Sequence, residues 1–331
     1  MQQESTLGRT LWIAILVLLV CYVAADFARS PFFAQRGAAA VQAPQLTLWI
    51  TGPEAGGEAE IVARQAAAGF ELSGHSTVVK RLDGGSSHAV AEFLSQPRRR
   101  RSADLLVLTN STLADLAHDR LDHLVPGAAE QAVLAQALLR RSTPIRALTA
   151  DRLVVAVNPQ AQIDGTTDLL EAMRSAPWDR LFAIADDSWS RVQLAALVER
   201  AGVDGEARFR IFGSGEEAGR AVGEGTAETA LITRGALLAG ANLRRLAWPV
   251  AGRVPRTWVA LVALPGLPAA RAAKLRRIVD QLLADRSWRV QQRRAGREPF
   301  GAASGSLPAL LLSGATRAAR LERLADRVER H

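Results

Sequence analysis

The chain has 331 residues, of which 48% are hydrophobic and 5% aromatic, and it carries a formal net charge of +8. This length allows one large globular domain or two with a sizeable core. The basic excess reflects an arginine-rich composition without interleaved aromatic residues, which argues against a nucleic-acid partner. A single cysteine excludes an internal disulfide, and the five histidines lack metal-ligand spacing, so we expect no metal site.

The first 43 residues are predicted to direct export. Residues 11–25 are continuously apolar, with a length between that of a signal-peptide core and a minimal membrane span. Val23, Ala24 and Ala25 supply the small residues that signal peptidase requires. Residues 1–43 are therefore a cleaved signal peptide, or an uncleaved anchor through residues 11–28, followed by a linker.

The next part of the chain repeats a unit of strand, polar loop and helix. The three strands are residues 46–50, 77–80 and 104–108, and their loops are residues 51–57, 83–87 and 109–112. The first loop is rich in glycine and leads into a helix, a combination that favours anion binding because backbone N–H groups and the helix dipole converge there. Such units predict a mostly parallel sheet with a ligand crevice beyond the carboxyl ends of its strands.

A second series of α/β units follows. Its strands are residues 151–157, 181–185, 209–212 and 229–233, and its polar loops include residues 186–191 and 213–215. The spacing of Gly213, Gly215 and Gly219 departs from the dinucleotide-binding fingerprint, so no nucleotide cofactor is expected. The strand 258–264 then leads through a Pro-Gly-Leu-Pro turn into an amphipathic helix.

Four stretches carry a family likeness in their order and spacing. They are Gly56 and Gly57 with residues 60–64, then residues 155–159, 201–204 and 258–299. Together they resemble the substrate-binding receptors of tripartite tricarboxylate transporters, also called Bug receptors. The resemblance implies an α/β fold of the periplasmic binding protein type II-like class, with two lobes and a hinged ligand cleft. Lobe 1 would comprise residues 44–147 and 255–331, and lobe 2 residues 148–254.

The resemblance also implies a function. A receptor of this family captures a small carboxylate in the interlobe cleft and delivers it to the membrane permease subunits of a tripartite tricarboxylate-type transporter. The chain would then be a periplasmic monomer without a cofactor. We find no nucleophile–base pair and no GxSxG motif, so an enzyme is not expected. The residues that match the family's ligand loops are Thr51, Gly56, Gly57, Gly85, Ser86, Ser87, Thr109, Asn110 and Ser111 on lobe 1, and Asp187, Ser188, Arg191, Phe212 and Ser214 on lobe 2.

Departures from the family pattern leave the ligand class open. Glu54 and Glu58 add negative charge beside the proposed anion loop, and Asp186 and Asp187 replace a hydroxyl-rich loop. Arg191 would pair either with a ligand carboxylate or with one of these two aspartates. The acids would otherwise select a ligand with an amino group or mark a degenerate site. In the last case the alternative is an envelope signalling or scaffold protein that contacts a sensor domain.

One aromatic residue in the second series has two interpretations. Trp189 follows the Asp186–Asp187 pair and belongs to the loop proposed to close over the ligand. It either lines the cleft as an apolar wall or packs between elements of the fold.

Overall fold

The computed structural model describes residues 45–51, 57–95, 103–121, 128–175, 182–185, 188–202, 209–239, 242–248 and 254–300. None of the helices within these ranges is both long and apolar enough to cross a membrane. The predicted export segment, residues 1–43, lies outside them.

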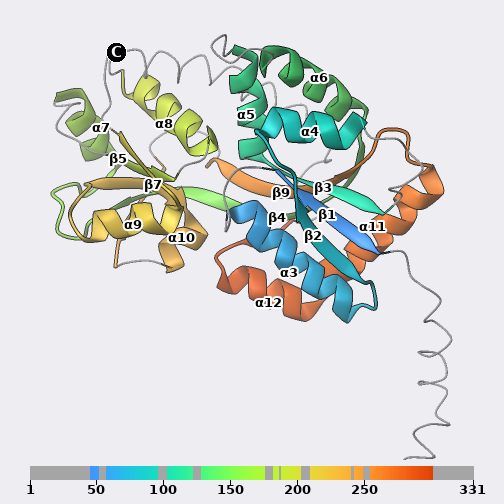
Figure 1. Ribbon diagram of the computed structural model, residues 1–331. Coiled ribbons are helices and arrows are strands. Elements are labelled where there is room, and N and C mark those ends of the chain that lie inside the picture. The colour runs from blue at the N-terminus through green and yellow to red at the C-terminus, as the bar shows by residue number, and fades with distance from the viewer. Residues whose placement is uncertain are drawn as a thin grey trace, which may run out of the picture.

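The described strands form one sheet that curves through the whole molecule (Figure 1). Its order is β2-β1-β3-β9-β4-β7-β5-β6, with β10 and β8 paired to β4 off this path. The strands are β1 (Leu46–Ile50), β2 (Thr77–Arg81), β3 (Asp104–Thr109), β4 (Thr143–Val157), β5 (Phe182–Ala185), β6 (Phe209–Phe212), β7 (Thr229–Thr233), β8 (Arg244–Leu246), β9 (Arg256–Ala263) and β10 (Glu298–Pro299). The mixed α/β fold with two sheet halves confirms the predicted fold class.

The prediction of a mostly parallel sheet holds only inside each half. The strands β1, β2 and β3 are parallel to one another, as are β5, β6 and β7. The centre is antiparallel. β4 extends from one half to the other and runs antiparallel to both β9 and β7, and β9 also runs antiparallel to β3. The predicted start of β4, at Asp151, is also wrong, since the strand begins at Thr143. Pro144 and two register shifts obscure the strand pattern in this segment.

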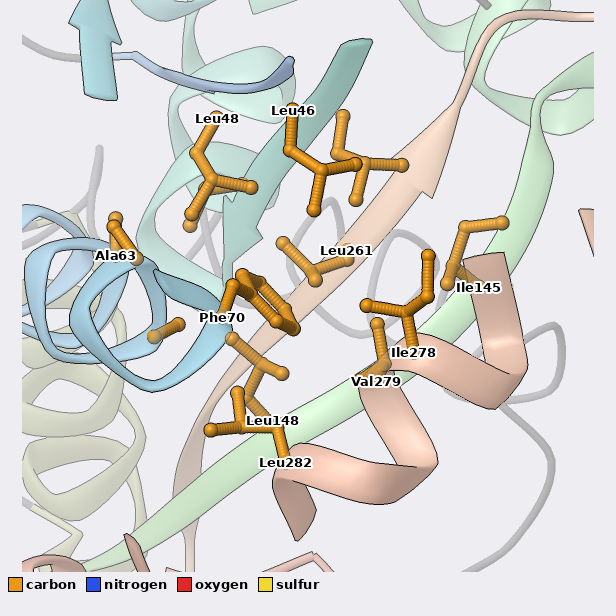
Figure 2. Packing of buried hydrophobic residues seen from close by; sticks show 14 of the residues in the cluster. Leu46, Leu48, Ala63, Phe70, Ile145, Leu148, Leu261, Ile278, Val279 and Leu282 are labelled. Atoms are coloured by element: carbon orange, nitrogen blue, oxygen red, sulfur yellow. The ribbon is translucent and has the colours of Figure 1, made fainter. Parts of the chain in front are cut away.

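Helices cover both faces of the first half of the sheet (Figure 1). The helices on one face are α3 (Glu58–Leu72), α11 (Ala269–Ala284) and α12 (Arg286–Arg294), and those on the other are α4 (Ser86–Ser95), α5 (Asn110–Leu121) and α6 (Ala128–Arg141). Phe70 of α3 packs without exposure against β1, β9 and α11 (Figure 2). Because both faces are covered, β3 and β9 are almost wholly apolar and do not alternate.

The second half repeats this arrangement of layers. The helices α7 (Thr166–Ser175) and α8 (Ser188–Ala201) cover one face, and α9 (Gly215–Gly223) and α10 (Arg234–Ala239) cover the other (Figure 1). α8 is buried on nearly every side, because it lies against β5 and β7 and also against α5 of the first half. The two halves are thus in contact through helices as well as through the sheet.

The two halves join within β4. Residues up to Arg152 pair with β9, and residues from Leu153 pair with β7. The buried carboxylate of Asp151 accepts hydrogen bonds from the backbone N–H of Arg152, at 2.7 Å, and of Gly235 in α10, at 2.9 Å. Close by, Nη2 of Arg152 lies 3.0 Å from Oε1 of Glu298 on β10. The start of α10 in the second half is therefore tied directly to the central strand.

Replacing Asp151 by asparagine is expected to lower the free energy of unfolding by about 1–2 kcal/mol, because the amide nitrogen cannot accept from one of the two backbone donors, whereas both oxygens of the carboxyl can accept even when it is protonated. Burial raises the pKa of the Asp151 carboxyl above its ordinary value of 3.8, against the opposing effect of the two N–H donors. The folded protein therefore holds this proton at a pH at which the unfolded chain has released it.

The sign of the pH dependence follows from this raised pKa. The contribution of Asp151 to stability is complete below the pKa of the unfolded chain and is lost as the pH rises through the raised pKa of the folded protein. The Asp151→Asn variant has no titratable group at this position. Urea unfolding of both proteins at acidic and neutral pH should show the advantage of the wild type shrinking toward neutral pH, and an advantage that grows instead would contradict this.

Candidate functional site

Three threonine hydroxyls gather beyond the carboxyl ends of β1 and β3. The Oγ1 atoms of Thr51 and Thr112 lie 3.2 Å apart, and the Oγ1 atoms of Thr109 and Thr112 are also 3.2 Å apart. The backbone N–H of Thr112 donates to Thr109 Oγ1 at 3.1 Å, which fixes the first turn of α5. Thr51 and Thr109, both predicted from the sequence as ligand residues, are therefore brought together, and Thr112 links them.

The start of α4 holds two further predicted residues beside α5. The Ser86 hydroxyl donates to Oδ2 of Asp115 on α5. Ser87 is almost fully buried, and its Oγ has no hydrogen-bond partner among the residues that the structure describes. Gly84 adopts a φ of +87° directly before Gly85, so this turn needs glycine at position 84.

Asn110 and Ser111 begin α5 in different roles. Asn110 is buried, and its Oδ1 accepts a hydrogen bond from the backbone N–H of Trp258 on β9 at 2.7 Å. Because this oxygen binds the neighbouring strand, Asn110 positions the start of α5. Ser111 is only partly buried and lies at the same helix start.

The acids beside the glycine-rich loop are paired with arginines. Gly57 is the N-cap of α3 and provides no side-chain hydrogen bond. Glu58 in the first turn lies 3.6 Å from Nε of Arg297, and the buried Glu60 pairs with Arg64 and Arg81. The extra negative charge that Glu58 brings to this loop is thus offset by Arg297.

The predicted ligand residues of the second half lie at or near the starts of α8 and α9. Ser214 is the N-cap of α9, and its Oγ accepts from the backbone N–H of Glu217 at 3.2 Å. The Phe212 ring lies 5.3 Å from the guanidinium carbon of Arg210. Arg191, in the first turns of α8, is partly buried. Arg191 and Ser214 therefore lie at the starts of the helices that follow β5 and β6, and Phe212 ends β6.

The helices α5 and α8 are in contact and so join the two halves. Ala114 of α5 is completely buried and belongs to the same hydrophobic cluster as Trp189, Val192 and Leu197 of α8. Trp189 is 2% exposed, so it packs between elements, one of its two predicted roles. Ser111 and Arg191 belong to the N-terminal turns of these two helices.

Some predicted residues lie outside the described residues. These are Gly56 and Asp187, together with the side chain of Ser188, whose backbone begins α8. Glu54 and Asp186 also lie outside. Within the described part of the chain, no group of three or more His, Cys, Asp or Glu side chains is arranged to hold a metal ion.

The predicted ligand loop of residues 109–112 included Thr112 without singling it out, and sequence reasoning missed Asp115 and Gln193 as candidate site residues. Helical spacing gave a usable indication for two of them, since Thr112 and Asp115 lie three residues apart on α5 and therefore share a face. Gln193 gave no such indication. It lies one turn after Trp189 in a helix that is buried on nearly every side, where no polar face can be recognised.

No family model matches the sequence, and no curated protein matches it either. Several solved structures do share its fold. MatC from Rhodopseudomonas palustris, with bound malate, matches with a TM-score of 0.63 and 16% identity over 85% of this chain and 100% of MatC. Rpa4515 of the same organism, with adipate, matches with a TM-score of 0.63 and 20% identity over 87% of this chain and 98% of Rpa4515.

A third match is the periplasmic binding protein BugD, with a TM-score of 0.62 and 14% identity over 86% of this chain and 99% of BugD. All three matches span nearly the full length of the solved protein, so both halves of the sheet are shared. The chain therefore has the fold of the tripartite tricarboxylate transporter-type solute-binding proteins, as the resemblance of its sequence predicted.

Proposed function

We propose that this chain is a solute-binding receptor that captures a small carboxylate between the two halves of its sheet. The linked hydroxyls of Thr51, Thr109 and Thr112 are the observation that carries this proposal, because they gather at the carboxyl ends of parallel strands, where α/β folds bind ligands. The malate and adipate bound by proteins of the same fold support the class of ligand.

The ligand would be held mainly by uncharged donors. The threonine hydroxyls, Ser87 and the backbone N–H groups at the starts of α3, α4 and α5 would donate to one carboxylate. From the second half, Arg191 would supply the positive charge, and its planar guanidinium suits a carboxylate because it can form two parallel hydrogen bonds. Gly57, Gly85, Ser214 and Phe212 complete the proposed set.

Binding would favour a closed arrangement of two lobes. The proposed lobe 1 comprises residues 44–147 and 255–331, and the proposed lobe 2 comprises residues 148–254. The lobes would move relative to each other by bending in β4 and in the segment that leads to β9. A ligand that contacts both lobes stabilises the closed form by its difference in affinity for the two forms. No covalent step is needed, so the proposed receptor is not an enzyme.

Export and delivery complete the proposal. Residues 1–43 would direct the chain to the periplasm, where BugD, which has the same fold, is a binding protein. There the monomeric receptor would pass its ligand to the permease subunits of a tripartite tricarboxylate-type transporter. Co-purification of the tagged receptor with these subunits from membranes, dependent on added ligand, would test this last step.

Replacing Arg191 by alanine is expected to weaken binding of the carboxylate about 10- to 100-fold, which corresponds to losing hydrogen bonds to a charged group. The measurement is a thermal-shift screen of residues 44–331 against a panel of mono-, di- and tricarboxylic acids that includes malate and adipate, followed by calorimetric titration of each acid that raises the unfolding temperature.

The matched control is Arg220→Ala, which removes the same charge from an exposed position on α9 of the same half. It should leave the affinity unchanged. If neither wild type nor control responds to any acid in the panel, the receptor proposal is contradicted, and the alternative of an envelope scaffold that contacts a sensor domain gains support.

A further inference from the structure

Two buried N–H donors on α8 lack an acceptor among the residues that the structure describes. Trp189 is 2% exposed and Gln193 is 5% exposed. Neither Nε1 of Trp189 nor Nε2 of Gln193 has a hydrogen-bond partner within the described parts of the chain. The two residues lie four positions apart in one helix, so their side chains are neighbours on its surface. A buried donor without a partner is costly, and two neighbouring ones point to a missing acceptor.

These donors lie beside the place where the two halves meet. Trp189 shares a hydrophobic cluster with Ala114 of α5, and the helices α8 and α5 are in contact. Thr112, two residues before Ala114, belongs to the hydroxyl cluster of the first half. An acceptor between α5 and α8 would therefore lie close to both proposed sets of ligand residues.

We propose that Trp189 Nε1 and Gln193 Nε2 are specificity-determining donors for a second acceptor group of the ligand. This inference rests on the proposed function and narrows it to acids that carry a carboxylate or carbonyl oxygen in addition to the first carboxylate. Two neutral donors suit such a group because they fix its direction without adding a charge. Monocarboxylates without a second acceptor would leave both donors unsatisfied and bind more weakly.

The same donors make closure depend on the ligand. Both donors are buried and α8 is in contact with α5 of the first half, so an acceptor reaches them only when the elements around α8 separate. In an open form, water satisfies both donors. In a closed form without ligand, both are buried without partners, which disfavours that form. A ligand with a second acceptor removes this penalty and stabilises the closed form.

Gln193→Leu tests the inference, because leucine has a similar size and no donor. In the absence of ligand, the variant should unfold at a higher temperature than the wild type, since its closed form no longer buries an unsatisfied donor and therefore adds to the stability of the folded protein. Its affinity for malate and adipate, measured by calorimetric titration, should fall about tenfold for each acid that binds the wild type, as expected for one hydrogen bond to a charged group.

Thr229→Val is the matched control. Thr229 is 1% exposed, and its Oγ1 also lacks a partner among the described residues, but it lies at the amino end of β7, away from the loops that follow the strands. This variant should likewise raise the unfolding temperature while leaving the affinity for both acids unchanged. Equal effects of both variants on affinity would overturn the inference.

A spectroscopic measurement follows the donor itself. The indole N–H resonance of Trp189, identified by its loss in Trp189→Phe, should move downfield in a ¹H–¹⁵N spectrum when an acid with a second acceptor binds. The inference would be overturned, and the receptor function left intact, if such an acid bound without shifting this resonance and Gln193→Leu bound it as tightly as the wild type. Failure of every acid in the panel to bind the wild type would overturn both.

Discussion

Replacing Phe70 by alanine is expected to lower the free energy of unfolding by about 3–5 kcal/mol, the range for a large aromatic side chain removed from a core that cannot collapse around the cavity. Phe70 has no exposed surface and packs among β1, β9 and α11, where side chains from distant parts of the chain converge (Figure 2). Urea denaturation followed by circular dichroism measures the change.

Leu72→Ala is the control for this prediction. Leu72 lies two residues further along α3 and is 85% exposed, so its replacement should change the free energy of unfolding by no more than about 0.5 kcal/mol. Similar losses in both variants would show that α3 itself, and not the cavity, determines the effect. A loss of less than about 1 kcal/mol for Phe70→Ala would contradict the packing described for this core.

Strands that lead directly into a covering helix were predictable from the sequence. β1, β3, β6 and β7 follow apolar or β-branched segments that end in glycine, serine, threonine or asparagine, and each lies within a residue of its predicted bounds. Local pattern suffices there because each strand leads directly into a helix that covers it. The same pattern located the loops that carry Thr51, Ser86 and Thr109.

The centre of the sheet could not be predicted in this way. β4 serves both halves, and its pairing partner changes between Arg152 and Leu153. Nothing in the local sequence specifies a strand that is shared, because the pairing depends on β9, which lies about a hundred residues later in the chain. The antiparallel direction of β4 and β9 is therefore a tertiary property.

The site shows the same division between local and distant causes. Helix starts with hydroxyl residues were visible in the sequence, but the partners of those residues were not. Glu58 looked like unwanted negative charge beside an anion loop, and it is offset by Arg297 from the C-terminal part of the chain. Asn110 looked like a ligand donor, and its oxygen binds the backbone of Trp258. Such pairings arise only once the sheet brings distant segments together.

Replacing Gly296 by alanine is expected to lower the free energy of unfolding by about 2–5 kcal/mol, because a left-handed residue with a side chain costs roughly 1–2 kcal/mol and forced overpacking adds about 1–3 kcal/mol. Gly296 has a φ of +76°, and a Cβ atom there would lie 2.7 Å from the Cα atom of Gly235. The backbone of the first half meets that of α10 at this point, beside the hydrogen bond from Gly235 to Asp151.

Gly225→Ala separates the two contributions to this effect. Gly225 has nearly the same φ, +75°, but a Cβ atom there would meet nothing within 4 Å, so this variant should lose only the conformational part, roughly 1–2 kcal/mol. The difference between the two variants, measured by urea unfolding, then reports the clash between the halves. Because the Gly296 contact joins α10 of the second half to the turn between α12 and β10 of the first half, only Gly296→Ala should also alter the separation of the halves, measured as the radius of gyration in solution scattering. Equal losses in both variants would show that the close approach of Gly296 to Gly235 does not constrain the fold.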